Sequence, residues 1–190
     1  MPLYAQLFAD LDALKLVNRR TYVEGGVRLE NSAEHSWHVA MAAWALANHL
    51  DRKVSLERLL KLALVHDLGE IDAGDTFLYS ADRHSVSDAE RVGVSKLAST
   101  YEPLIPDMLE LWDEQELGAT PEAKLLKVAD RLLPFLHNIL SEGKTWRENG
   151  IVRGQVLAMH SFIEAEEPEI FGWMIGELDR AVENGWLKDS

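Results

Sequence analysis

A histidine–aspartate pair, His66–Asp67, directly follows an apolar run at residues 59–65 that has helical spacing. Adjacent side chains on a helix point about 100° apart, so this pair can bind one cation beside the helix end. Imidazole nitrogen and carboxylate oxygen are both ligands of divalent transition metals. Taken alone, the pair is equally well explained by a hydrogen-bonded histidine and a solvated carboxylate, so other residues must decide.

Two further polar residues lie in apolar helical segments elsewhere in the chain. His35 falls in the first turn of a predicted helix, and Asp130 interrupts the apolar stripe of residues 125–133. A carboxylate within a core-facing stripe is costly unless it is paired or binds a metal. With His66 and Asp67, these residues make a set of two nitrogen and two oxygen ligands. That set suits one ion of Mn²⁺, Co²⁺, Fe²⁺ or Zn²⁺ and leaves positions for water and substrate.

A third acidic residue, Glu70, follows three residues after Asp67 and four after His66. On a helical turn this spacing places its carboxyl near the open positions of the metal. Glu70 can therefore move a proton without being a ligand itself. The alternative is a solvated glutamate at the end of a helix.

Helices must position these residues, because apolar residues recur at helical spacing along nearly the whole chain and strand-like alternation is almost absent. The sequence therefore predicts an all-α protein. An irregular segment that ends at Gly25–Gly26 is expected to carry arginines towards the site. Capping and turn residues predict where the helices begin and end. The predicted helices cover residues 3–14, Asn31 or Ser32 to about 50, Ser55 to about 69, Ser87 to before Pro103, a short segment that ends at Trp112, and then residues 122–140, 151–165 and 168–184.

The composition is that of a soluble globular protein with a single domain, residues 1–190. Hydrophobic residues make up 47% and charged residues 27% of the 190 residues, which is enough to bury one core. The sequence has no cysteine, which excludes disulfides, zinc–cysteine sites and thiol catalysis. Any metal must therefore be bound by histidine, aspartate or glutamate.

The net charge of −13 argues against binding to a nucleic acid polymer or to an anionic membrane. A small anionic ligand needs only a local positive patch, and residues 15–28 provide one. The N-terminus carries no basic signal region, and the longest uncharged apolar run, residues 39–47, is far shorter than the roughly 20 residues of a membrane span. We expect a cytoplasmic protein.

The order His35, His66–Asp67 and Asp130 resembles the H…HD…D pattern of the HD-domain metal-dependent phosphohydrolase superfamily. The resemblance covers about residues 5–140, and the C-terminal helices at 151–185 are expected to pack on this core. Further segments are similar to the 5′-deoxynucleotidase branch: Arg20, Arg28, ENSAEHS at 30–36, ALVHDLGE at 63–70, Gly74–Asp75, LWDE at 111–114 and TPEAK at 120–124.

The resemblance implies an all-helical fold, usually a homodimer, that removes phosphate from nucleoside 5′-monophosphates. It implies that the four residues named above bind one divalent metal, which activates water at neutral pH. Glu70 and Asp75 correspond to acidic residues beside the phosphate, and either one is a donor for the proton that the leaving oxygen needs. Arg20 corresponds to a phosphate-binding arginine and Glu114 to a residue of the nucleoside pocket.

Other functions remain open at this point. One is an HD phosphohydrolase of another nucleotide or phosphorylated metabolite, and others are a nucleotide-binding module without turnover and a structural protein without a site. The family places a tryptophan beside the arginine where this chain has Arg19–Arg20–Thr21–Tyr22, so the choice between ribose and deoxyribose stays open. Diiron oxygenases with this scaffold insert two extra histidines before Asp130, whereas this chain has only His84 there.

Two tryptophans, Trp37 and Trp44, are seven residues apart and so share one helical face. Packing in the core or in a dimer explains them better than base stacking. His38 lies one turn after His35 and is interpreted as a packed or solvent-facing histidine, or as a hydrogen-bonding partner of the site.

Overall fold

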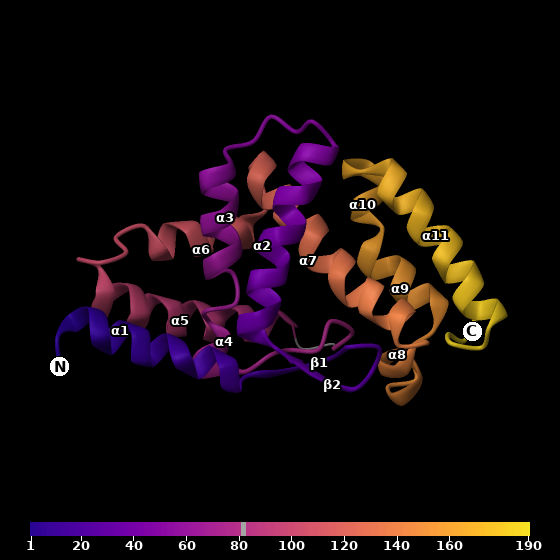
Figure 1. Ribbon diagram of the computed structural model, residues 1–190, viewed down its shortest axis with the longest axis horizontal. Coiled ribbons are helices and arrows are strands. Elements are labelled where there is room, and N and C mark those ends of the chain that lie inside the picture. Colours follow the sequence, from indigo (N-terminus) through magenta and orange to yellow (C-terminus); the bar gives the residue numbers. More distant parts are fainter. Residues whose placement is uncertain (81–82) are drawn as a thin grey trace.

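The computed structural model describes residues 1–80 and 83–190, and nearly all of its regular structure is helical, which confirms the predicted fold class (Figure 1). The helices are α1 (Leu3–Leu11), the 3₁₀ turn η1 (Asp12–Leu16), α2 (Ser32–His49), α3 (Leu56–Val65), α4 (Glu70–Ala73), α5 (Arg83–Tyr101), α6 (Met108–Leu117), α7 (Pro121–Leu140), α8 (Lys144–Glu148), α9 (Arg153–His160), α10 (Phe162–Glu166) and α11 (Pro168–Glu183). No helix in the described part of the chain is long and apolar enough to cross a membrane.

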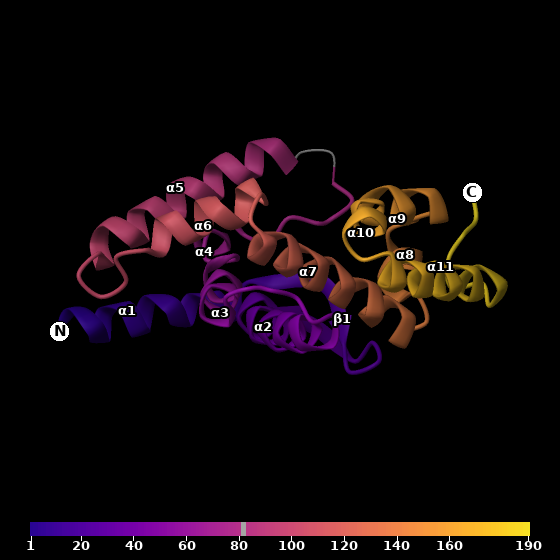
Figure 2. The ribbon, with the colours of Figure 1, turned by 90° about the horizontal axis from the view of Figure 1, so that it is seen from above.

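Helix α7 contributes buried side chains to two apolar clusters. One cluster joins α7 to α2, α3 and α6 around residues such as Leu126 and Trp112. The other joins α7 to α8–α11 around Phe135 and Trp146. Figures 1 and 2 show α8–α11 at one end of the molecule and α1, α5 and α6 at the other. The C-terminal helices thus pack on the last turns of α7.

The helices that carry the polar residues begin at well-formed caps. The Asn31 side chain accepts a hydrogen bond from the Glu34 backbone at 3.0 Å, and the Glu34 carboxylate accepts one from the Asn31 backbone at 2.7 Å. This reciprocal box fixes the start of α2 and selects Asn31 rather than Ser32 as its cap. Thr120 caps α7, with Pro121 at the first helical position, as predicted.

A β-hairpin replaces the irregular segment expected before α2. Strand β1 (Asn18–Val23) pairs antiparallel with β2 (Arg28–Asn31). The turn uses left-handed backbone at Glu24, Gly25 and Gly26, with φ of 54°, 65° and 99°. The strands are too short to give a clear alternation in the sequence, and the hairpin tip is held by Lys144, whose ammonium donates to the Gly26 carbonyl at 2.8 Å.

Several predicted helix limits were wrong. Helix α5 begins at Arg83, and Ser87 is not its cap but donates to Glu116 at 2.7 Å. Helix α6 continues five residues past Trp112 to Leu117. The helix expected over 151–165 is interrupted at Ser161, whose hydroxyl donates to the Ala158 carbonyl at 3.2 Å and competes with regular helix hydrogen bonding.

Candidate metal centre

The four predicted ligands come from three packed helical segments. His35 lies in the first turn of α2, His66 and Asp67 lie in the turn that ends α3, and Asp130 lies midway along α7. One ligand atom from each of His35, His66 and Asp130 lies within 4.8 Å of the others. Asp67 Oδ1 lies 3.1 Å from His66 Nε2. The structure therefore brings all four residues together.

The two imidazoles are oriented by acceptors behind them. His66 Nδ1 lies 2.8 Å from the Ala63 carbonyl, and His35 Nδ1 lies 3.1 Å from Glu30 Oε2. Each Nδ1 therefore carries its hydrogen, and each Nε2 faces the centre. His66 Nε2 is buried and has no hydrogen-bond partner among the described residues. With its hydrogen on Nδ1, His66 has only a lone pair at Nε2, so the 3.1 Å contact with Asp67 Oδ1 joins two acceptors and is no hydrogen bond. Two acceptors this close fit ligands of one cation.

Asp130 lies on the other side of the His35 ring, with Oδ1 3.0 Å from Nε2. Burial and the Arg19 charge lower the pKa of His35, but hydrogen bonds to Asp130 and Glu30 outweigh them and raise it to about 9. Burial works against the charge of Asp130, yet Arg131 and His35 hold its pKa well below the usual range. A proton thus occupies the position between His35 and Asp130 that a cation would otherwise take.

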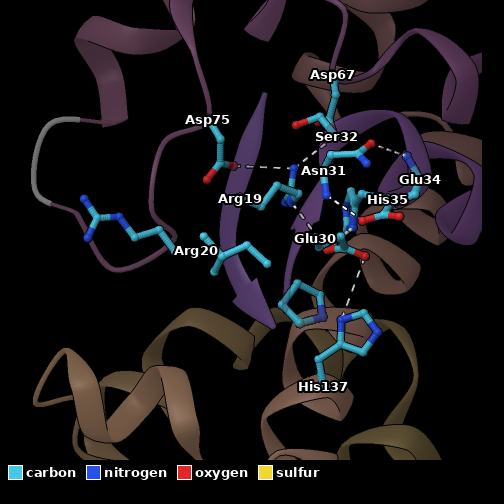
Figure 3. A network of polar contacts seen from close by, with 12 residues as sticks. Arg19, Arg20, Glu30, Asn31, Ser32, Glu34, His35, Asp67, Asp75 and His137 are labelled. Atoms are coloured by element: carbon cyan, nitrogen blue, oxygen red, sulfur yellow. Dashed lines mark hydrogen bonds and ion pairs between the residues drawn. The ribbon is translucent and has the colours of Figure 1, made fainter. Parts of the chain in front are cut away.

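Arg19 lies at the centre of a group of carboxylates (Figure 3). Its Nη1 lies 3.0 Å from Asp67 Oδ2, 3.4 Å from Glu70 Oε1 and 3.5 Å from Asp75 Oδ1. Burial and the charge of Asp67 raise the pKa of Glu70 to about 9, although Arg19 opposes this shift. Burial also raises the pKa of Asp75. Glu70 therefore holds a proton at neutral pH, and the Ser32 hydroxyl lies 2.5 Å from its Oε2.

These groups open into a cleft of about 560 Å³, within the range of small-molecule sites. Apolar side chains from α7, α9 and α10, including Leu126, Met159 and Phe162, form part of its wall. The ionisable side chains that line it are Arg19, His66, Asp67, Glu70, Asp75, Glu90, Glu116, Lys127, Asp130 and Arg131. Carboxyl groups outnumber the cationic groups Arg19, Lys127 and Arg131 in this lining, so the cleft offers an anion a favourable surface only when a cation is bound among the carboxylates.

Arg20 and Glu114, the residues predicted to bind substrate, are not brought to this cleft. The Arg20 guanidinium lies over the Phe77 ring, 5.8 Å from its centre, and extends away from the carboxylates that Arg19 contacts (Figure 3). Successive side chains of a strand point to opposite faces, so only one of the two arginines can face the metal centre. Glu114 accepts hydrogen bonds from Arg58 Nε at 2.6 Å and from the Thr120 hydroxyl at 2.6 Å, which hold it against α3 and the start of α7.

Three residues of this centre were not assigned a role from the sequence. Arg19 and Glu30 belong to the hairpin, and Ser32 is the first residue of α2, directly after it. Glu30 and Ser32 lie in the ENSAEHS segment, which gives the only hint in the sequence. Their roles depend on the hairpin, which the sequence pattern did not predict.

Comparison with known proteins identifies the family. Residues 11–171 match the HD-domain family. A 5′-deoxynucleotidase from Klebsiella pneumoniae is 33% identical over 141 residues, 70% of each chain, and the 5′-deoxynucleotidase YfbR of Escherichia coli matches to the same extent.

Solved structures show the same similarity. A structure described as a predicted metal-dependent phosphohydrolase from Magnetospirillum magnetotacticum is 35% identical, with a TM-score of 0.89 over 98% of this chain and 94% of that chain. An HD-domain phosphohydrolase from Listeria innocua, 20% identical, shares the fold with a TM-score of 0.70 over 96% and 95% of the two chains.

The fold and the site together define a helical metal-dependent hydrolase. This chain belongs to the HD-domain family of metal-dependent phosphohydrolases. Its similarity to the 5′-deoxynucleotidases places it near that branch.

Proposed function

We propose that this protein is a phosphomonoesterase that removes the 5′-phosphate from nucleoside monophosphates, deoxynucleotides among them. The observation that carries the proposal is the convergence of four side chains: His66, Asp67 and Asp130 line one cleft beside Arg19, and the buried His35 contacts Asp130 directly. The named activity of the 33% identical relatives supports the substrate class.

The residues present fit a single divalent ion, because a buried imidazole nitrogen without a partner faces two carboxylates. We propose His35, His66, Asp67 and Asp130 as its ligands and Mn²⁺, Co²⁺, Fe²⁺ or Zn²⁺ as its identity. Such an ion, when bound, lowers the pKa of water and neutralises part of the phosphate charge.

Arg19 is the proposed phosphate-binding group. Its side chain is 11% exposed and lines the cleft, and its Nε has no hydrogen-bond partner among the described residues. A guanidinium presents several donors in one plane and binds two phosphate oxygens at once. Arg19 therefore takes the role that the sequence assigned to Arg20.

Glu70 is the proposed proton donor for the leaving 5′ oxygen, and Asp75 positions Arg19. Both line the cleft, and burial raises the pKa of each. Glu70 is favoured as the donor because its pKa of about 9 keeps it protonated at neutral pH. The apolar wall near Phe162 is the proposed contact surface for the nucleoside.

Phosphate release from a panel of nucleotides tests this function. Purified protein with Mn²⁺ or Co²⁺ should hydrolyse nucleoside 5′-monophosphates and leave 3′-monophosphates and 5′-triphosphates intact. Turnover of triphosphates alone would assign a different HD phosphohydrolase activity. Binding of monophosphates without phosphate release would assign a nucleotide-binding module.

We also propose that two copies of the chain pair through α2. Trp37, Met41 and Trp44 lie along one face of this helix and are 64%, 45% and 43% exposed. This spacing of three and four residues forms one apolar stripe on the surface. Of the two explanations given by the sequence, exposure favours dimer packing over a place in the core.

A further inference from the structure

A second cluster of metal-ligating side chains lies next to the HD centre. Glu30 is on β2, His38 is on α2 and His137 is on α7, and one ligand atom from each lies within 4.8 Å of the others. None of the three is a member of the HD ligand set. Figure 3 shows Glu30 between His35 and His137.

Glu30 presents its two oxygens to different histidines. Its Oε2 lies 3.1 Å from His35 Nδ1, and its Oε1 lies 3.9 Å from His137 Nδ1. The second distance is too long for a hydrogen bond. Glu30 is 1% exposed, so this carboxylate has almost no contact with solvent.

His137 Nδ1 is left without a partner. His137 is 8% exposed, and its Nδ1 has no hydrogen-bond partner in the part of the chain that the structure describes. An imidazole nitrogen that is buried and unpaired is costly. The cost disappears if a cation occupies the space between this nitrogen and the Glu30 carboxylate.

His38 completes the cluster and opens it towards the surface. Its ring centre lies 5.5 Å from that of His137 and 6.1 Å from that of Trp37, which is 64% exposed. His38 itself is half-buried. An ion can therefore reach the cluster along the exposed surface of α2.

We propose that Glu30, His38 and His137 form a second divalent-cation site, distinct from the HD centre, with the donor chemistry of zinc. Two imidazole nitrogens and one carboxylate oxygen are a donor set that binds Zn²⁺ with a fourth position open to water. Zinc bonds to these atoms at about 2.0–2.2 Å, so its ligand atoms lie roughly 3–3.5 Å apart. Small side-chain rotations that shift Glu30 Oε1 and His137 Nδ1 by a few tenths of an ångström bring these two atoms to this spacing.

The shared carboxylate couples the two sites. Glu30 Oε2 hydrogen bonds to His35, while Oε1 faces the second site. A cation at the second site withdraws charge from the acceptor that orients His35, so it weakens binding at the HD centre. Binding linkage is reciprocal, so an ion at the HD centre weakens the second site by the same factor.

Zinc stoichiometry tests this site without measuring activity. Metal-free protein is titrated with Zn²⁺ against a chromophoric chelator, and bound zinc is confirmed by elemental analysis. The wild type should bind two Zn²⁺ per chain. His38→Gln and His137→Gln should each bind one, and His66→Gln, which removes an HD ligand, should also bind one. The control is His49→Gln, which changes an exposed histidine on the same helix as His38, and this variant should still bind two Zn²⁺.

The outcomes separate this proposal from the proposed function. One Zn²⁺ in the wild type that is lost in His66→Gln but kept in His137→Gln would overturn the second site and leave the HD centre intact. Two Zn²⁺ in both His38→Gln and His137→Gln would also overturn it. Circular dichroism of each variant shows that it is folded, and the zinc bound to His66→Gln reports the second site in a chain that retains all three of its ligands.

Discussion

His35 Nε2 lies 3.0 Å from Asp130 Oδ1, although 95 residues separate the two in the chain. The contact joins the first turn of α2 to the middle of α7, and the turn that ends α3 supplies His66 beside it. Helix packing therefore places a buried carboxylate against two imidazoles. This arrangement is stable only when a proton or a cation lies between them.

Removing the Asp130 carboxylate should abolish metal-dependent activity. In Asp130→Asn the amide is a poor ligand, so the concentration of Mn²⁺ or Co²⁺ that gives half-maximal phosphate release should rise by about 100-fold or more. Asp113→Asn is the matched control, because this carboxylate is paired with Arg91 on the surface. An unchanged metal requirement in Asp130→Asn would exclude Asp130 as a ligand.

Replacing the proton-donating carboxyl of Glu70 by an amide should slow the reaction without loss of metal. Glu70→Gln keeps the shape and the hydrogen-bonding capacity towards Ser32, so metal content should be unchanged. Loss of acid–base catalysis should lower kcat by about 100-fold or more. Glu116→Gln, which lines the same cleft, should change kcat by less than about 3-fold. Equal kcat in Glu70→Gln and the wild type would remove the assigned role.

The two adjacent arginines should differ in their effect on substrate. Arg19→Lys keeps the charge but loses the planar set of donors, so kcat/KM for a nucleoside 5′-monophosphate should fall by about 10-fold or more. Arg20→Lys should change kcat/KM by less than about 3-fold, because Arg20 lies over Phe77. The reverse order of effects, measured by steady-state phosphate release, would assign phosphate binding to Arg20.

Burial of Glu70 should make the metal-free protein less stable at high pH. Burial raises the folded-state pKa of Glu70 from 4.5 to about 9, so the unfolded chain loses this proton first as the pH rises. The stabilisation of the folded state by the proton on Glu70 is complete below about pH 4.5 and is lost as the pH approaches 9. The measured quantity is the thermal midpoint of Glu70→Gln minus that of the wild type, both in the presence of a chelator. This difference should therefore increase by about 4 °C or more between pH 5 and pH 9. A constant difference across this range would contradict the raised pKa.

Pairing through α2 should depend on its exposed tryptophans. Light scattering should give the mass of a dimer for the wild type and that of a monomer for Trp44→Glu, because a charge in an apolar interface is costly. Leu117→Glu, at a residue that is 78% exposed on α6, should remain a dimer. A dimer in Trp44→Glu with the stability of the wild type would exclude this face.

The sequence could single out the four proposed metal ligands, which the structure brings together, because polar residues at apolar helical positions are costly and therefore informative. His66–Asp67 at the end of an apolar run and Asp130 within an apolar stripe both stand out in this way. Long helices and their starts were predicted for the same local reasons: Thr120 as the cap of α7, and Asn31 or Ser32 as the cap of α2, of which the structure selects Asn31.

Glu70 and Asp75 were singled out from the sequence, but the other groups around the proposed ligands could not be predicted, because they depend on tertiary contacts. The choice between Arg19 and Arg20 requires the hairpin, since strand alternation decides which of them faces the site. Glu114 is held outside the cleft by its hydrogen bond from Arg58, which is 56 residues away in the sequence. Glu30 meets His137 only after β2 and α7 have packed.

Anomalous scattering from crystals of cobalt-loaded protein would locate the ion itself. A peak at the cobalt edge should lie within about 2.0–2.3 Å of His35 Nε2, His66 Nε2 and one oxygen of each of Asp67 and Asp130. A loaded, fully occupied crystal with no peak among these four side chains would show that they do not hold the metal.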